Sequence, residues 1–160
     1  MFDAAVVDRL EQAAGRTGKR DAAFGRLTTI GCGGTAAFLI EADSSEHLAA
    51  LLEVAAPRSI DCFILGLGSN LLVADTGWDG LVIRMTGQLK ECLVNAVGGI
   101  DCGGGASLPR VAALAAEAGL SGLEPLSGIP GTMGGAVAMN AGAWGTAIGD
   151  RIEQVEVCLP

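Results

Sequence analysis

The chain has 160 residues, of which 50% are hydrophobic and 18% are charged. This composition supplies enough apolar surface for a buried core, so it excludes intrinsic disorder and fits one domain or two small lobes. The net charge is −8 and no long cluster of Lys or Arg occurs, so we expect no nucleic-acid partner. The 25 glycines have no three-residue period, which excludes collagen and indicates turns and close backbone contacts.

Cysteine spacing and the N-terminus indicate a cytoplasmic protein. No two cysteines have the CxxC spacing of a zinc site, so we expect reduced thiols, no metal and no disulfide framework. The start, MFDAAVVDRLEQ, carries acidic residues where a signal peptide needs a basic start and an apolar core. The cysteines are Cys32, Cys62, Cys92, Cys102 and Cys158.

The first part of the chain predicts one helix, a loop and a strand. Apolar residues at helical spacing predict a helix over 3–14 that ends at Gly15. The basic stretch GRTGKRD (15–21) is expected to be a solvated loop. The run TAAFLIEA (35–42) then predicts a buried strand.

A second helix is predicted after this strand. Asp43 precedes it and Glu46 lies three residues further on, which is the spacing of a capping box, and Pro57 ends it. Apolar strands are predicted at 62–66 and 80–85. This order predicts a small α/β layer as a first lobe over 27–86, preceded by the N-terminal helix and loop over 1–26.

The rest of the chain, 87–160, predicts a second lobe. Residues 92–97 and 98–105 are expected to form paired strands, and Ser107 and Pro109 to begin a helix. Residues 151–159 predict a final strand. The predicted inner face of the helix consists of Val111, Leu114, Ala115 and Ala118, with Gly119 at its end.

The predicted final strand has no following partner in the chain. An unpaired apolar edge favours aggregation, so the strand is expected to pair with an earlier strand, to be covered through self-association, or to belong to a longer protein.

The glycine loop GLGSNLLV (66–73) directly follows a predicted strand. A Gly-x-Gly turn exposes backbone N–H groups, and Ser69 and Asn70 add side-chain donors, as in sites that bind phosphate. The loop lacks the third glycine of a dinucleotide fingerprint, so a plain tight turn is an equal alternative.

The segment GIPGTMGGAVAMNAGAWG (128–145) contains no charged residue. Its prolines and glycines exclude a membrane span, and its glycines pack too little volume for an ordinary core. We therefore expect a loop whose backbone lies against a flat, partly anionic ligand. Together the two glycine segments predict a large nucleotide cofactor spread across two lobes.

Three stretches of the sequence resemble a known family. They are ILGLGSNLLV (64–73), GLSGLEPLSGIPGTMGGAVAMNAGAWG (119–145) and TTIGCGGTA (28–36). Together they resemble the signature of the UDP-N-acetylenolpyruvoylglucosamine reductases, also called UDP-N-acetylmuramate dehydrogenases. The resemblance extends over residues 26–158. One departure is Trp144, which stands where the family has Tyr.

The resemblance implies an α+β fold: a two-lobed FAD-binding domain of the PCMH, or vanillyl-alcohol-oxidase, type. FAD would lie between the lobes, with its diphosphate on the first loop and the rest along the second segment. The implied cofactor-binding residues are Gly66, Leu67, Gly68, Ser69, Asn70, Leu71, Ser127, Ile129, Pro130, Gly131, Thr132, Gly134, Gly135, Ala136, Asn140, Ala141, Gly142 and Ala143.

The resemblance also implies a flavin oxidoreductase of peptidoglycan precursor synthesis. NADPH, as co-substrate, would reduce the flavin, which would then reduce UDP-N-acetylglucosamine enolpyruvate to UDP-N-acetylmuramate. The family's substrate-contacting Arg, proton-donating Ser and late Glu have no counterpart before Pro160. The second lobe is therefore expected to be truncated, the C-terminal substrate domain absent and the chain alone inactive, with the UDP-sugar bound only if that domain is supplied.

No catalytic residue is expected within the chain. His47 is expected on the surface of a helix, Glu124 as a local cap or salt-bridge partner, and Ser127 and Thr132 as hydrogen-bond donors to the flavin without a nearby base. Two alternatives stay open: a stand-alone FAD- or nucleotide-binding module without reductase activity, and a fragment of an FAD-linked hydroxy-acid oxidase.

Overall fold

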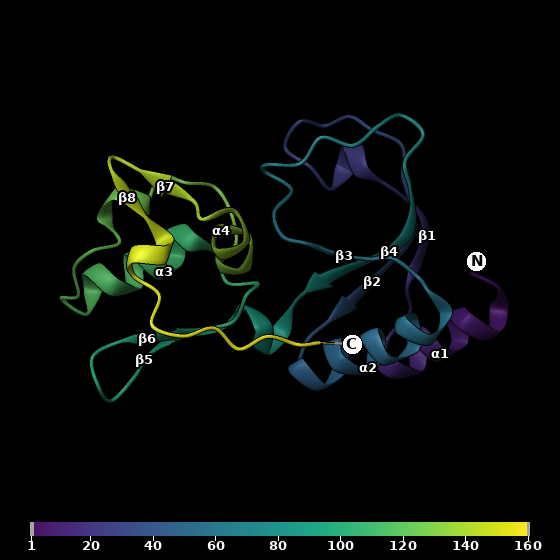
Figure 1. Ribbon diagram of the computed structural model, residues 1–160, viewed down its shortest axis with the longest axis horizontal. Coiled ribbons are helices and arrows are strands. Elements are labelled where there is room, and N and C mark those ends of the chain that lie inside the picture. Colours follow the sequence, from purple (N-terminus) through teal and green to yellow (C-terminus); the bar gives the residue numbers. More distant parts are fainter. Residues whose placement is uncertain (1, 160) are drawn as a thin grey trace. The chain divides into compact units, whose positions relative to one another are not determined.

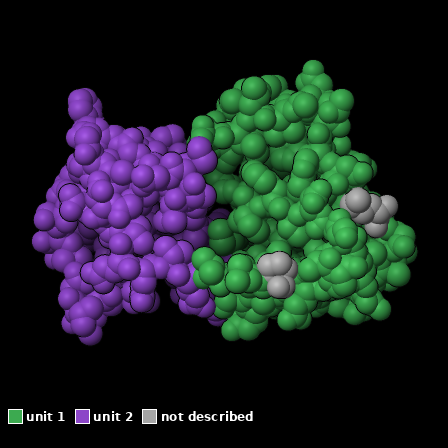
Figure 2. Space-filling view, viewed as in Figure 1, with its two compact units in different colours: residues 1–87, 157–160 green, residues 88–156 purple. Residues whose placement is uncertain are grey.

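The computed structural model describes residues 2–159, which form two compact units. Unit 1 consists of residues 2–87 together with 157–159, and unit 2 consists of residues 88–156 (Figure 2). Each unit has its own secondary structure and its own buried apolar residues (Figure 1). Short 3-10 turns occur at Phe24–Arg26, Ala56–Arg58, Gly87–Lys90, Glu124–Leu126 and Ile148–Asp150.

Unit 1 contains a four-stranded mixed sheet and two helices. The strand order is β1-β2-β4-β3, with β1 antiparallel to β2 and with β2, β4 and β3 parallel to one another. The helices α1 and α2 pack against each other and against β2. The strands are β1 (Lys19–Ala23), β2 (Thr35–Ala42), β3 (Cys62–Leu65) and β4 (Trp78–Met85), and the helices are α1 (Ala4–Ala14) and α2 (Ser45–Ala55).

The hydrophobic pattern of each strand matches its place in the sheet. β4 lies between two neighbours and is buried on both faces, so Leu81, Val82 and Ile83 are consecutive and all inaccessible to solvent. β2 also lies between two strands but alternates, with Phe38 and Ile40 buried and Leu39 half-buried. β3 is an edge strand, and its first three residues are exposed.

The ends of the helices follow from local hydrogen bonds. The carboxylate of Asp3 accepts the N–H of Val6 at 2.8 Å and begins α1, and Gly15, with φ of +63°, ends it as the sequence predicts. Ser44, not Asp43, caps α2, because its hydroxyl accepts the N–H of His47 at 3.2 Å. The predicted start at Asp43 was wrong by one residue.

Asp43 does not cap the helix because other side chains hold it. Its carboxylate forms an ion pair with Arg16, and Nδ1 of His47 lies 2.6 Å from its other oxygen. Arg16 also contacts the carboxylate of Glu41 at 3.2 Å. Arg16 is distant from Asp43 in sequence, so a local capping pattern does not predict the ion pair between them.

The stretch predicted as a basic loop, 15–21, is partly a strand. Residues from Lys19 onward pair with β2, with Lys19 opposite Leu39 and Ala22 opposite Ala36. Ala22 is buried and the charged residues before it are exposed. The strand forms because a free edge of the sheet is available, which the charge-rich local sequence does not indicate.

Unit 2 combines two hairpins with two helices. Residues around the predicted hairpin form β5 and β6, and α3 follows, with Ser107 at the position before its first residue and no hydrogen bond from the Ser107 side chain. The elements are β5 (Cys92–Val94), β6 (Ile100–Cys102), α3 (Leu108–Glu117), α4 (Met133–Met139), β7 (Gly142–Ala143) and β8 (Thr146–Ala147).

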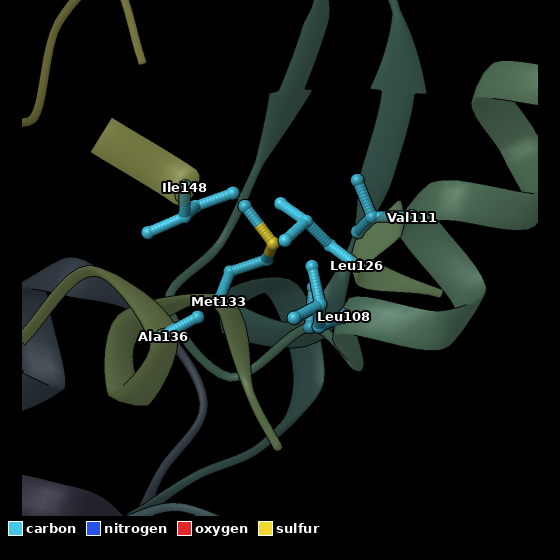
Figure 3. Close-up of a cluster of buried hydrophobic side chains, with 7 residues drawn as sticks. Leu108, Val111, Leu126, Met133, Ala136 and Ile148 are labelled. Atoms are coloured by element: carbon cyan, nitrogen blue, oxygen red, sulfur yellow. The ribbon is translucent and has the colours of Figure 1, made fainter. Parts of the chain in front are cut away.

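The core of unit 2 draws on α3, α4 and the turns around them (Figure 3). Val111 and Ala115 of α3 are buried as predicted, but Leu114 is only half-buried and Ala118 lies exposed after the end of the helix. Full burial stabilises each large aliphatic side chain by about 1.5–3 kcal/mol. The cluster consists of Ala106, Leu108, Val111, Leu126, Met133, Ala136 and Ile148.

The final strand predicted over 151–159 does not form. Residues 152–159 have no regular secondary structure, and Val155, Val157 and Leu159 are exposed. An alternating sequence becomes a strand only where a neighbouring edge supplies hydrogen bonds, and no described strand pairs with this stretch. Within residues 2–159, no helix has both the length and the apolar content needed to span a membrane.

The core of unit 2 can be tested with one leucine and a matched control. Leu126→Ala removes a side chain with 0% exposure and should lower the free energy of unfolding by about 2–5 kcal/mol. Leu93→Ala, at a position with 66% exposure, should change it by less than about 0.5 kcal/mol. Urea unfolding followed by circular dichroism measures both, and equal losses would contradict the assigned core.

Candidate cofactor-binding site

The first glycine segment, 66–71, continues directly from β3. It lies beyond the carboxyl end of a strand in the parallel part of the sheet, where ligands commonly bind in α/β layers. No residue of the segment is charged. Leu67 is 49% exposed and Asn70 is exposed, whereas Gly68 is buried.

Gly68 is required by the packing of the chain itself. Its φ is +66°, and a Cβ atom here would overlap the carbonyl oxygen of Leu27 and approach Cα of Thr28. Its carbonyl accepts the N–H of Thr29 at 3.1 Å, and the Thr29 hydroxyl lies 3.4 Å from the same oxygen. The threonine and glycine stretch at 28–34 therefore packs against the loop and holds it by hydrogen bonds.

Two further glycines of this stretch make similar contacts. A Cβ at Gly33 would meet Val73, and one at Gly34 would overlap the backbone of Asp75 and Gly77. Sequence reasoning noted TTIGCGG only as part of a resemblance and did not assign it a position. The high glycine content of this stretch could have predicted that its backbone packs directly against the backbone of another segment.

Several amides of the first segment are available to a ligand. Within the described chain, the N–H groups of Leu67, Gly68 and Asn70 have no hydrogen-bond acceptor. Gly68 is buried, and a buried N–H group usually has a partner, whereas Leu67 and Asn70 are exposed. Donors without a protein acceptor suit an anionic group. Such donors are a feature that a phosphate site requires.

An apolar groove of about 270 Å³ adjoins this segment within unit 1. The rings of Phe63 and Trp78 meet edge to face, with centroids 6.0 Å apart. A larger hollow of about 590 Å³ lies along α1 and α2 and includes Arg9 and Arg58, but none of the predicted site residues. The hollow is open to solvent, so its volume does not indicate a binding site.

The sequence predicts a loop for the second glycine segment, 128–145, and this prediction was wrong for part of it. The segment contains the short helix α4, which begins after Thr132, whose hydroxyl accepts the N–H of Gly135 at 3.3 Å. Met133 and Ala136 point into the core of unit 2 (Figure 3), while Gly135 is exposed. Some residues of the segment are therefore buried in the core, and others are exposed.

The beginning of α4 is bound to the turn between β6 and α3. The N–H groups of Met133 and Gly134 donate to the carbonyls of Ala106 and Gly104, both at 2.8 Å. The carbonyl of Gly131 accepts the N–H of Leu108 at 3.0 Å. Sequence reasoning missed this support, although the glycine run GGGA at 103–106 signalled a close backbone approach.

Other amides of the second segment remain available. Within residues 2–159, the N–H groups of Gly128, Gly131 and Thr132 donate no hydrogen bond. Thr132 is only 5% exposed and uses its hydroxyl as a cap. Ser127 is exposed, and its hydroxyl donates to the carbonyl of Glu124 at 2.8 Å. Pro130 is exposed and Ile129 is half-buried.

The predicted residues 140–143 have a structural role as well. Asn140 ends α4 with φ of +44°, and its side-chain oxygen accepts the N–H of Gly149 at 3.1 Å. Ala141 accepts the N–H of Ile148 at 2.8 Å, and 142–143 form β7. Trp144, in the turn between β7 and β8, is 92% exposed.

The candidate acid–base residues are occupied locally. The carboxylate of Glu124 accepts the N–H of Gly122 at 2.6 Å. Hydrogen bonds from its own backbone and from Gly122 hold the pKa of Glu124 below its ordinary value, which keeps it ionised as a local cap. His47 lies on α2 with its side chain 37% exposed, and its Nδ1 is 2.6 Å from a carboxylate oxygen of Asp43. No cluster of metal-ligating residues occurs within the described part of the chain.

Comparison with known families identifies the family to which the chain belongs. The family described as FAD binding domain matches residues 36–160. The chain belongs to this FAD-binding family. FAD is the cofactor of the family, and the predicted α+β class of FAD-binding fold is confirmed.

Relatives with known names point to one branch of FAD-binding proteins. The chain is 44% identical over 142 residues to a UDP-N-acetylenolpyruvoylglucosamine reductase of Synechococcus, with 89% of this chain and 47% of the relative covered. A reductase of the same name from Carboxydothermus hydrogenoformans is 41% identical, with 80% of this chain and 42% of the relative covered. The chain therefore spans less than half the length of these relatives.

A solved structure supports the same relationship. The crystal structure of UDP-N-acetylenolpyruvylglucosamine reductase (MurB) from Thermus caldophilus is similar with a TM-score of 0.68 and 38% sequence identity. The similarity covers 80% of this chain and 44% of that one. The predicted resemblance to the reductase family is thus confirmed.

The residues present fit the diphosphate of FAD by the chemistry of their donors. Both segments offer amide N–H groups that have no acceptor in the described part of the chain, and both lack Lys and Arg, so oriented amides would replace positive charge. The individual cofactor contacts stay predictions.

The structural role of Gly68 can be separated from the effect of its backbone angle. Gly68→Ala adds a Cβ that overlaps Leu27 and should destabilise the chain by about 3 kcal/mol or more. Gly31→Ala is the control, because Gly31 has φ of +76° with its nearest neighbour 4.0 Å away, so the loss should be about 1 kcal/mol. Thermal or urea unfolding measures both, and a Gly68→Ala loss no larger than the control would refute the contact.

Proposed function

We propose that the chain binds FAD through both glycine segments and forms the FAD-binding part of a UDP-N-acetylenolpyruvoylglucosamine reductase. The observation that carries this proposal is the set of unpaired amides at Leu67, Gly68 and Asn70, in a chain of the FAD-binding family. The 40–44% identity to reductases of that name supports the choice of enzyme.

In this proposal the first segment holds the diphosphate. The amides of Leu67, Gly68 and Asn70 donate to phosphate oxygens, and the Ser69 and Asn70 side chains add polar contacts. The Thr29–Gly68 hydrogen bond keeps the turn in its binding conformation before the cofactor arrives, which lowers the entropic cost of binding.

The second segment orients the rest of the cofactor. The exposed backbone around Gly131 and Gly135 allows close approach, and the contacts of Met133 and Gly134 with the turn at 103–106 hold that backbone rigid. The remaining assigned residues, 127–143, keep this side of the ligand free of charge. FAD, when bound, supplies hydride transfer from NADPH to the enolpyruvyl double bond of the UDP-sugar.

A change of charge at the first segment tests the diphosphate assignment. Asn70→Asp alters an exposed side chain and adds a negative charge, so repulsion of phosphate should weaken FAD binding about tenfold. Gln12→Glu places the same charge change on the exposed side of α1 and should leave the affinity unchanged. Flavin fluorescence titration of the purified chain gives both dissociation constants.

Two results would contradict the proposal. A wild-type chain that is colourless and takes up no FAD would remove the cofactor assignment. An Asn70→Asp variant with wild-type affinity would move the diphosphate away from the first segment. Gly134→Val is a poor test of cofactor binding, because a Cβ there would lie 3.0 Å from the carbonyl oxygen of Gly104 and would disturb the chain itself.

A second candidate is an FAD-binding module that does not itself reduce the substrate. It is favoured by the local hydrogen bonds of Ser127 and Thr132. Within residues 2–159 their hydroxyls are bonded to the carbonyl of Glu124 and the N–H of Gly135, and neither is bonded to a titratable side chain that could make it a proton donor.

Both candidates predict that the isolated chain does not catalyse the reduction. The 160-residue chain, loaded with FAD, is expected to form no UDP-N-acetylmuramate from NADPH and UDP-N-acetylglucosamine enolpyruvate. Absorbance of NADPH and chromatography of the UDP-sugar measure the reaction. Turnover at the rate of a complete reductase would show that residues of this chain suffice for proton transfer.

A further inference from the structure

Cys92 and Cys102 lie directly opposite each other in the hairpin formed by β5 and β6. They are register partners in its antiparallel ladder. The N–H of Gly103 donates to the carbonyl of Glu91, and the N–H of Asn95 donates to the carbonyl of Gly99, both at 2.9 Å. Hydrogen-bonded and non-hydrogen-bonded pairs alternate along such a ladder. The cysteines therefore occupy a non-hydrogen-bonded pair.

This position brings two side chains close together. At a non-hydrogen-bonded pair the Cα atoms are typically about 4.5 Å apart, which falls within the range that a disulfide spans. Both thiols are half-buried and pack on the same core cluster of unit 2. Burial raises the pKa of the Cys102 thiol, and the neighbouring Cys92 adds to this increase, as expected for groups in proximity.

We propose that Cys92 and Cys102 form a reversible disulfide when the chain meets a low-molecular-weight disulfide such as oxidised glutathione. One cysteine thiolate attacks a sulfur of the small disulfide, and one small thiolate leaves. The second cysteine, after losing its proton, attacks the resulting mixed disulfide and releases the other small thiolate. The two cysteines lose two electrons and two protons, and the small disulfide is reduced to two thiols.

The other cysteines do not share this arrangement. Cys32, Cys62 and Cys158 are exposed, and none has a cysteine as its strand partner, since Cys62 pairs with Leu81. The hairpin is therefore the one place in the described strands where register alone sets two thiols opposite each other.

The proposed bond would act next to the second glycine segment. The turn 103–106 begins directly after Cys102, and its carbonyls at Gly104 and Ala106 hold Gly134 and Met133. A cross-link between β5 and β6 would restrain the start of this turn without using any residue assigned to the cofactor. The disulfide is thus an addition to the proposed FAD site.

The experiment compares the reduced and oxidised forms of the 160-residue chain. After incubation with oxidised glutathione, free thiols are alkylated and the protein is digested with trypsin. Both cysteines fall in one tryptic peptide, 91–110, because no Lys or Arg lies between Lys90 and Arg110. The expected result is an unalkylated peptide lighter by two hydrogens, which becomes doubly alkylated after treatment with dithiothreitol. The oxidised chain should also unfold about 5 °C or more higher.

Variants separate this pair from the remaining thiols. Cys92→Ala should abolish the increase in unfolding temperature and leave Cys102 alkylated or as a mixed disulfide with glutathione, whereas Cys62→Ala should leave both effects unchanged. The proposal is overturned if peptide 91–110 of the wild type is doubly alkylated after oxidation, or if its cysteines are linked to other peptides. The wild-type digest decides this even if the Cys92→Ala variant does not fold.

Discussion

Direct contact between backbone segments, with glycine at the contact, holds both candidate loops in place. In unit 1, Gly68 lies against 27–29 so closely that a Cβ would overlap a carbonyl oxygen, and its own carbonyl binds Thr29. In unit 2, the N–H of Gly134 binds the carbonyl of Gly104. A Cβ would overlap its neighbour at Gly68 and would make a tight contact of 3.0 Å with the Gly104 carbonyl oxygen at Gly134. The loops therefore owe their shapes to hydrogen bonds and to the absence of Cβ atoms.

This packing leaves a consistent set of groups for a ligand. Amides that face the supporting backbone are satisfied by it, and those of Leu67, Gly68, Asn70 and Gly131 have no acceptor among residues 2–159. The chain has a net charge of −8 and no Lys or Arg in either segment, so an anionic diphosphate would be held by amide dipoles instead of side-chain cations. Membership in the FAD-binding family agrees with this chemistry.

Local patterns predicted most elements, because caps and burial periodicity act over a few residues. Asp3 and Gly15 bound α1 as expected, and the apolar run of β4 marks a strand buried on both faces. For the candidate site, the sequence predicts two neutral, glycine-rich segments, and their contacts with the cofactor stay predictions. The helix α4 was missed because core contacts of Met133 and Ala136 override the low helix propensity of a glycine-rich sequence.

The sequence by itself determined the family, the two glycine segments and their lack of charge, since these depend on residue identity alone. Only the tertiary structure decided which groups face one another. Lys19–Ala23 form a strand because they pair with the edge of β2. Asp43 forms an ion pair with Arg16 instead of capping the helix. The tertiary structure also set Cys92 opposite Cys102, because the register of a hairpin depends on pairing between residues that local sequence does not specify.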